Sequence, residues 1–547
     1  MAKRDKTGKR RGAPAAAARP PAPPPRPSRP PLLSPPLALA LAAAAALAFF
    51  FAARWTAQQP WSYDEYYHLG LARLMRTSFR VTSFHWTPFS LAYDHFADKE
   101  PLFHLLLMPF AGLSLERAGL AGALLGQLFL IGVFAGILWK LKAPGAPWLL
   151  LALAGLGPMF ALRVDMCRPH VWLIGFSLLA LGLLAALPPE TSWKALLPVA
   201  ALAGLAHAGG WITVGFAALW GVAGLLSRVP SERRIEWRPA AGAAAGWLSG
   251  QLVHPNVPEN FRLLWLVNAV IPFQSTAGDA ALRAQLGNEL TPPELPVLVD
   301  QWAAFIAPAL VAVLLFGNPR LRTRSTVTAA LAALAFLFAG TFFLRRFFEL
   351  GAPLALLALA LVLRERKEQG LPPLLPRAGR LLAALGIALA AVWTWSALRV
   401  QGFGETSPPR EMAAWMAAHG QSGERVFTAQ WADSAPLFYT APQVQSLVAL
   451  DPTLFWVKSP HLFAVYAQIV EGRHPAPARA IRDSFGARWV TIWKQPTYRR
   501  LAEQLAATPG ALIPFNTPEY LIFDLSYLSR AAEPPARPMV VPRPRPR

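Results

Sequence analysis

Long apolar runs separated by short polar loops constrain this chain more than any other feature. The run Leu32–Ala53 is long enough to cross a bilayer, and similar runs recur as far as residue 398. The chain is 54% hydrophobic and only 15% charged, whereas soluble domains usually carry about a quarter charged residues. The sequence therefore predicts a polytopic α-helical membrane protein with about eleven transmembrane helices.

The basic residues indicate an orientation for these helices. Much of the formal net charge of +22 lies in the N-terminal tail and in alternate short loops. This bias marks the cytoplasmic side of a membrane protein, so the lipid bilayer is the expected partner and nucleic acid is not. We expect a multi-pass protein of the bacterial cytoplasmic membrane with a cytoplasmic N-terminus. The spans predicted after the first cover residues 118–139, 146–163, 171–187, 194–206, 210–226, 239–253, 303–316, 326–343, 348–363 and 381–398.

Composition also divides the chain into domains. Residues 1–31 are basic and Pro/Ala-rich, which predicts a disordered cytoplasmic tail, and 532–547 form a second disordered Pro/Arg-rich tail. The membrane domain covers 32–398, with a first outer loop at 54–117 and a long outer loop at 254–302. Short apolar strand patterns such as Trp489–Trp493 predict a small α/β domain on the outer face over 399–531.

The first outer loop carries two polar motifs. Asp64 and Glu65 stand side by side, and His68 lies one helical turn after Asp64. Asp98-Lys99-Glu100 precedes a proline that suits a first helical turn. Charged groups beside a membrane span are costly unless they are solvated or functional. Each motif taken alone also fits a wet helix surface or an ordinary helix start.

Further polar groups fall on the same predicted face. An Arg–Asp structural pair is one explanation for two of them, and a lone histidine at a helix end is more often a capped core residue than a site. A pair of arginines on the outer face opposes the charge bias and suits a phosphate ligand. The candidates in these loops are Asp165, Arg168, His170, His207, His254, Asn256, Arg345, Arg346 and Glu349.

This arrangement resembles the GT-C superfamily of membrane glycosyltransferases. The resemblance depends on Asp64-Glu65 after the first span, Asp98-Lys99-Glu100-Pro101-Leu102 before the second, and the C-terminal outer domain. Protein O-mannosyltransferases and lipid A aminoarabinose transferases share this plan. The chain looks most like bacterial members with an Arg-Arg-Phe-x-Glu segment and a Leu-Asp-Pro motif, here Leu450-Asp451-Pro452. Many relatives have two prolines after the lysine where this chain has Glu100-Pro101, which leaves the acceptor class open.

The resemblance implies a hexosyl- or pentosyltransferase that uses a polyprenyl-phosphate-linked sugar. The sugar would pass with inversion to a glycan, lipid or protein acceptor on the outer face. We expect Asp64 to act as the base with Glu65 beside it, and cationic side chains to hold the donor phosphate. The phosphate candidates are Arg345, Arg346, Arg168 and Lys99, and the substrate-binding candidates are His68, Asp98, Glu100, Asp165, His170, His207, His254, Asn256 and Glu349.

No metal ligand is assigned from the spacing, although Asp64, Glu65, Asp165 and His68 are residue types that can ligate a divalent ion. Two other functions stay open at this point. A transporter or lipid flippase would place polar groups near the middle of its spans, whereas these spans are mainly Ala, Leu, Gly and Val. A non-catalytic GT-C-like protein, such as a scaffold whose outer domain binds glycans or a partner, would keep the same architecture.

Overall fold

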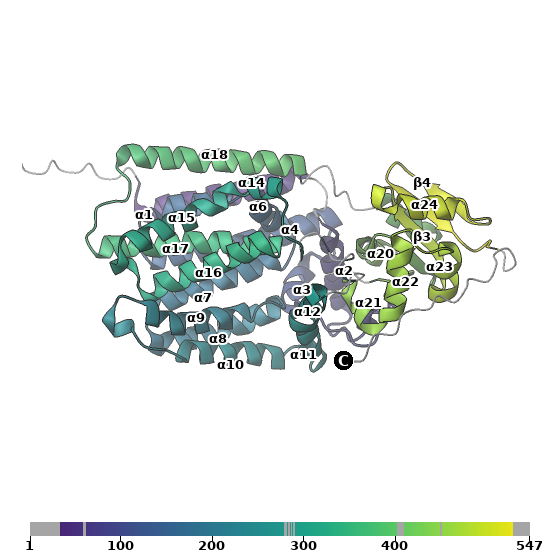
Figure 1. The fold of residues 1–547 in the computed structure, drawn as a ribbon, viewed down its shortest axis with the longest axis horizontal. Coiled ribbons are helices and arrows are strands. Elements are labelled where there is room, and N and C mark those ends of the chain that lie inside the picture. The colour runs from purple at the N-terminus through teal and green to yellow at the C-terminus, as the bar shows by residue number, and fades with distance from the viewer. Residues whose placement is uncertain are drawn as a thin grey trace, which may run out of the picture.

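The protein has a long helical bundle and a small α/β domain at one end of it (Figure 1). The computed structural model describes residues 33–57, 62–277, 282, 285, 287, 290–401, 410–448 and 451–528. Both predicted tails lie outside these residues. The prediction of a mainly helical membrane protein with a small C-terminal α/β domain is confirmed.

Five of the described helices are long and apolar enough to cross a membrane. They are α1 (Pro35–Ala57), α4 (Leu115–Lys140), α16 (Arg324–Phe342), α17 (Phe348–Glu368) and α18 (Arg377–Gln401). A helix pair bent by 91° is a candidate sixth span. The pair consists of α5 (Ala146–Leu151), which continues as a 3-10 turn, and α6 (Pro158–Asp165).

Shorter helices run alongside these spans in the same bundle (Figure 1). They are α7 (His170–Ala186), α8 (Pro189–Ala206), α9 (Ile212–Ala223), α10 (Arg238–Leu252) and α15 (Ile306–Gly317). Several are shorter than the roughly 20 residues that a straight span needs. The predicted count of about eleven transmembrane helices is therefore not confirmed.

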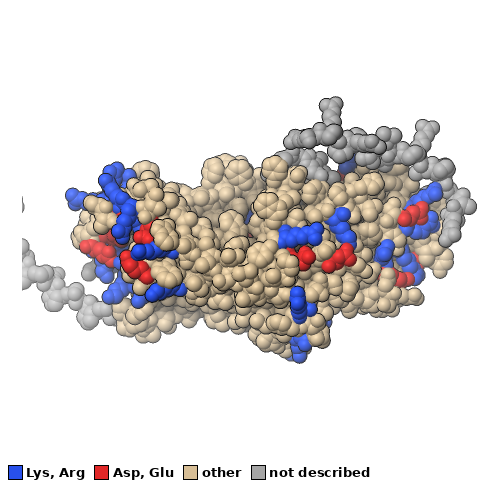
Figure 2. Space-filling model, turned by 90° about the horizontal axis from the view of Figure 1, so that it is seen from below, with Lys and Arg blue, Asp and Glu red and all other residues tan. Residues whose placement is uncertain are grey.

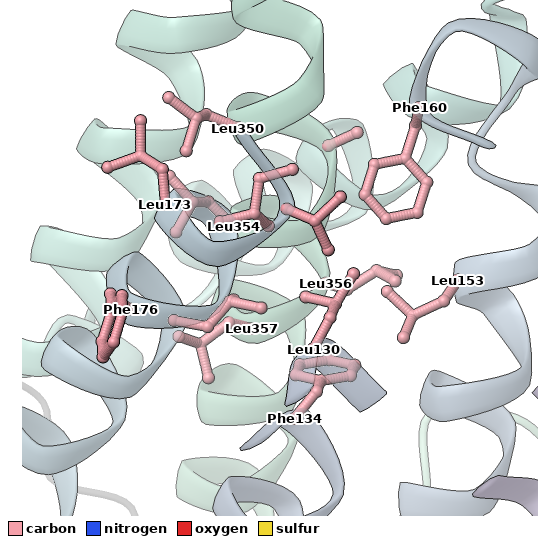
Figure 3. Close-up of a cluster of buried hydrophobic side chains, with 14 of the residues drawn as sticks. Leu130, Phe134, Leu153, Phe160, Leu173, Phe176, Leu350, Leu354, Leu356 and Leu357 are labelled. Atoms are coloured by element: carbon pink, nitrogen blue, oxygen red, sulfur yellow. The ribbon is translucent and has the colours of Figure 1, made fainter. Parts of the chain in front are cut away.

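Helix α17 forms the centre of the bundle. Every residue from Phe348 to Val362 is buried, so this helix is apolar all round, as a core helix must be. Figure 3 shows its leucines Leu354 and Leu357 packed among side chains of α4, α6 and α7, including Phe134 and Phe160. This packing aligns the bundle helices and fixes the positions of the loops at their ends.

The outside of the bundle is also apolar. Helix α18 exposes Leu381, Leu382, Leu385, Leu389 and Val392. Figure 2 shows a broad surface almost without charge between two regions where Lys, Arg, Asp and Glu gather. Exposed leucine and valine on this scale are stable in hydrocarbon and unfavourable in water, which agrees with a bundle that spans a membrane.

Short helices lie between the bundle and the α/β domain (Figure 1). Apart from α14 (Leu295–Asp300), which lies over the bundle below α18 in Figure 1, they are α2 (Tyr63–Thr77), α3 (Pro101–Leu107), α11 (Glu259–Trp265) and α12 (Ile271–Ala277). We call this region the domain-side end of the bundle. It contains both motifs of the first predicted outer loop.

The C-terminal domain has a five-stranded sheet in the order β2-β1-β3-β5-β4. Strand β1 runs parallel to β2 and β3, whereas β5 is antiparallel to β3 and β4. The predicted strands Trp489–Trp493 and Tyr520–Phe523 lie wholly within β3 and β5. The predicted strand Arg425–Ala429 is one residue shorter as β1, the strand described within Val444–Ala449 is β2, and β4 was not predicted. The strands are β1 (Arg425–Thr428), β2 (Gln445–Ser446), β3 (Ala487–Trp493), β4 (Leu512–Asn516) and β5 (Tyr520–Asp524).

Six helices complete this domain, and α20 also packs on α2 of the bundle. Phe427, Phe455 and Phe485 are fully buried in the core between the sheet and its helices. The helices are α19 (Arg410–His419), α20 (Ser434–Thr440), α21 (Thr453–Lys458), α22 (Pro460–Val470), α23 (Pro477–Phe485) and α24 (Arg499–Ala506).

Glycines bring α8 and α10 into close contact. A methyl group on Gly246 would overlap the backbone carbonyl oxygen of Leu197, and one on Gly250 would lie 2.6 Å from the carbonyl oxygen of Ala201. Small residues four apart allow two membrane helices to approach backbone to backbone. This contact attaches α10, and with it the loop that follows, to the rest of the bundle.

We predict that Gly246→Ala destabilises the folded protein by about 1–3 kcal/mol, because the added methyl must push α8 and α10 apart. The control is Gly136→Ala, since a methyl group at Gly136 would meet no atom within 4 Å. The measurement is thermal unfolding in detergent. Equal unfolding midpoints for the two variants would show that the close approach contributes nothing.

Candidate functional site

Adjacent carboxylates at the start of α2 have different environments. Asp64 forms an ion pair with Arg168, which follows α6, and its side chain is 17% exposed. Glu65 is fully buried, 2.9 Å from the guanidinium of Arg54 on α1, and it accepts a hydrogen bond of 3.1 Å from the backbone N–H of Cys167. Glu65 therefore ties three segments together, whereas Asp64 is the carboxylate that keeps some access to solvent.

Asp98 organises the loop before α3. Its carboxylate accepts hydrogen bonds from the backbone N–H of Glu100 at 2.9 Å and from Nδ1 of His104 at 2.7 Å. Its backbone N–H donates to the side-chain oxygen of Asn256 at 3.2 Å, and its carbonyl accepts from Nε2 of His254 at 3.0 Å. Residues from the first and the long predicted loops thus hold one short turn in place.

A hydrogen-bonded chain links this turn to α2. Nδ1 of His68 lies 2.8 Å from Nε2 of His104, and both rings are buried. Glu100 occupies the position just before the first residue of α3 and is also buried. Burial, and next the negative charge of Asp98, raise the pKa of Glu100 to about 7.

Lys99 meets the C-terminal domain. Its ammonium lies 2.5 Å from the carboxylate of Asp451, and both side chains are about one quarter exposed, at 28% and 27%. Burial opposes the charge of both groups, but their attraction outweighs it, so the pKa of Lys99 is raised and the pKa of Asp451 is lowered. The site is therefore built from both parts of the protein.

Arg346 supplies a second positive charge. It lies in a 3-10 turn, Arg345–Phe347, between α16 and α17. Arg346 lies close enough to Lys99, His170 and His207 for its positive charge to disfavour protonation of these side chains. Among the residues that the structure describes, none forms an ion pair with Arg346. The rings of His170 and His207 are 4.8 Å apart. Lys99 and Arg346 thus bring two positive charges to one region, beside the carboxylates of Asp451 and Glu100.

Other predicted site residues have structural partners elsewhere. Arg345 donates its backbone N–H to the carbonyl of Thr291 at 3.1 Å. The carboxylate of Glu349 lies 2.6 Å from the guanidinium of Arg163, and buried Asp165 accepts a 3.0 Å hydrogen bond from Gln127. Glu65, Asp165, Arg345 and Glu349 thus have structural partners, which are Arg54, Gln127, Thr291 and Arg163 respectively.

Sequence reasoning missed His104 and the contact made by Asp451. The histidine sits inside an apolar helix, and its position four residues after Glu100 is the only local signal that it faces the same turn. Asp451 lies 352 residues after Lys99 in the chain, so no local sequence pattern connects the two.

The C-terminal domain is firmly docked beside the site. Nε1 of Trp86 donates to the carbonyl of Pro442 at 2.7 Å. The backbone N–H of Ser446 in β2 donates to the carbonyl of Trp86 at 2.8 Å, and Lys458 pairs with Asp94 at 2.7 Å. The loop between α2 and α3 therefore lies against the edge of the sheet and carries Lys99 towards Asp451.

The predicted resemblance to GT-C glycosyltransferases is confirmed at the level of the fold, because two solved structures of that class are similar to this one. The chain is similar to the oligosaccharyltransferase of Archaeoglobus fulgidus, solved with a tethered acceptor peptide containing the NVT sequon. That match has a TM-score of 0.54 and 12% identity, and covers 84% of this chain and 68% of the other. No protein-family model and no curated protein matches the sequence.

A second similar structure is ArnT from Cupriavidus metallidurans, solved with bound undecaprenyl phosphate. Here the TM-score is 0.55 and the identity 14%, with coverage of 90% of this chain and 98% of the other. The similarity therefore extends over the bundle and the C-terminal domain together.

We predict that Glu65→Ala destabilises the protein by about 3–5 kcal/mol, because it removes one partner from a buried ion pair. Asp64→Ala should cost less, because the Asp64–Arg168 pair keeps some access to solvent, whereas the Glu65–Arg54 pair has almost none. Thermal unfolding of both variants in detergent measures the difference. A larger loss for Asp64→Ala would contradict the division of roles between these two carboxylates.

Proposed function

We propose that this protein is a glycosyltransferase that moves a sugar from a polyprenyl-phosphate donor to an acceptor on the outer face of the cytoplasmic membrane, with inversion. One observation carries the proposal: a partly exposed carboxylate, Asp64, shares the domain-side end of the bundle with two cationic side chains, Lys99 and Arg346. Asp64 and Lys99 both act electrostatically on Glu100, and Arg346 acts on Lys99.

The chemistry needs a base and an anion site. The acceptor hydroxyl oxygen forms a bond to the anomeric carbon and gives its proton to the carboxylate of Asp64. The bond between that carbon and the phosphate oxygen breaks on the opposite face, and the phosphate leaves with the electron pair. Arg168 holds the Asp64 carboxylate in one orientation through their ion pair.

Lys99 and Arg346 suit the departing phosphate. Charge develops on the phosphate oxygens as the bond to the sugar breaks, and fixed cations stabilise that charge. An ammonium has three donors, so Lys99 can keep its contact with Asp451 while it binds a phosphate oxygen. Of the two neighbouring arginines, we assign this role to Arg346, because Arg345 is anchored to Thr291.

The membrane explains why the site lies at the end of the bundle. A polyprenyl chain is apolar and stays in the bilayer, along the uncharged surface of the bundle in Figure 2. Its phosphate then lies at the end of the bundle, where the charged groups are. One similar structure binds undecaprenyl phosphate and the other carries an acceptor peptide, which supports a lipid-linked donor and a separate acceptor for this chain.

The first test is transfer of label from polyprenyl-phosphate sugars to a membrane extract by purified protein in detergent. We predict that Asp64→Asn lowers the rate at least about a hundredfold, because an amide cannot accept the proton. Asp483→Asn removes a carboxylate from the surface of the C-terminal domain, one whose side chain is 49% exposed, and should keep the rate. Full activity of folded Asp64→Asn protein would overturn the assignment of the base.

The anion site has a separate test, binding of undecaprenyl phosphate to protein in nanodiscs. We expect Arg346→Gln and Lys99→Gln each to weaken binding about tenfold to a hundredfold, because each removes a charge-assisted hydrogen bond. The matched control is Arg345→Gln, which removes the adjacent arginine and should change binding less than about threefold. Equal losses at the two neighbouring arginines would contradict the assignment to Arg346.

A further inference from the structure

We infer that His68, Glu100 and His104 form a binding site for a zinc ion at the junction of α2 and α3. One ligand atom from each of these residues lies within 4.8 Å of the other two. All three side chains are buried, with exposed fractions of 5%, 8% and 0%. Two imidazoles and a carboxylate are the ligand set of many three-ligand zinc sites.

The histidine geometry suits an ion with little rearrangement. Nδ1 of His68 and Nε2 of His104 face each other at 2.8 Å. Two nitrogens on one zinc ion lie about 3.3 Å apart, given zinc–nitrogen bonds of about 2.0–2.1 Å. An opening of about half an ångström between the rings therefore converts the hydrogen bond into two coordinate bonds.

Asp98 prepares His104 as a ligand. Its carboxylate accepts the proton of Nδ1 at 2.7 Å, so Nε2 carries the lone pair that faces His68 and Glu100. A carboxylate behind a metal-bound histidine fixes the tautomer and strengthens the ligand. When the ion binds, the proton on Nδ1 of His68 moves to Nε2, and that ring stays neutral.

Glu100 supplies the third ligand and the negative charge. Its backbone N–H is held by Asp98 at 2.9 Å, and no described residue forms an ion pair with its carboxylate. A buried carboxylate is costly without a cation, and a zinc ion between it and the imidazoles removes that cost. Nitrogen ligands favour zinc over magnesium or calcium, which prefer oxygen alone.

A zinc ion at this position would link two segments of the domain-side end of the bundle. His68 lies on α2, one turn after Asp64, whereas Glu100 and His104 flank the start of α3, directly after Lys99. A bound ion fixes the separation of these segments. It therefore positions Lys99 relative to Asp64 and leaves a fourth coordination position for water.

The test is calorimetric titration of zinc chloride into chelator-treated full-length protein in detergent. We expect one equivalent to bind, and Glu100→Gln and His104→Gln each to weaken binding at least about a hundredfold. The control is His95→Gln, which replaces a histidine whose nearest charged partner is Glu259 at 3.1 Å, and it should bind zinc like the unaltered protein. If Glu100→Gln and His104→Gln bind zinc with the same affinity as the unaltered protein, the proposed site is wrong.

A second measurement needs no variant. Cobalt(II) bound to the unaltered protein by two imidazoles and a carboxylate should give the intense visible absorption of a four- or five-coordinate ion, and zinc should abolish it. A protein that is folded but gives neither a zinc heat nor a cobalt spectrum holds only a hydrogen-bonded histidine pair. Both measurements omit donor and acceptor, so a failed transfer assay leaves their result unchanged.

Discussion

Charge inside an apolar bundle must have a partner, and this rule places most of the polar groups of the protein. The buried pair of Glu65 and Arg54 connects α2 to α1, and the backbone of Cys167 completes it. The neighbouring Asp64 is partly exposed, and its charge is paired with that of Arg168. Since each of these carboxylates would be expensive alone, the ion pairs decide how the first helices and the loop after α6 come together.

The same rule explains why the two parts of the protein form one site. Lys99 follows Asp98, which four hydrogen-bonding groups hold in place, including those of His104 and Asn256. Its charge is matched by Asp451 of the C-terminal domain, whereas Arg346 has no such match among the described residues. A lipid-linked phosphate that arrives at this end of the apolar bundle would meet two cationic side chains, Lys99 and Arg346.

Much of this architecture could be predicted from sequence, because hydrophobic length and charge bias are local signals. The spans around α1, α4, α16, α17 and α18 follow from them, and so does the gathering of Asp64, Lys99 and His254 in loops. The different roles of adjacent residues could not be predicted, because they depend on how the helices pack. Nothing local distinguishes partly exposed Asp64 from buried Glu65, or Arg346 from anchored Arg345. The contacts of His104 and Asp451 likewise depend on residues distant in the chain.

The most direct measurement is an experimental structure of the protein in a nanodisc with bound undecaprenyl phosphate. The account predicts phosphate density within hydrogen-bonding distance of both Lys99 and Arg346, with the prenyl chain leaving along the apolar surface of the bundle. It also predicts that the Asp64 carboxylate faces the phosphate across a space large enough for one sugar. Phosphate density elsewhere on a folded protein, with these cations unoccupied, would contradict the central claim.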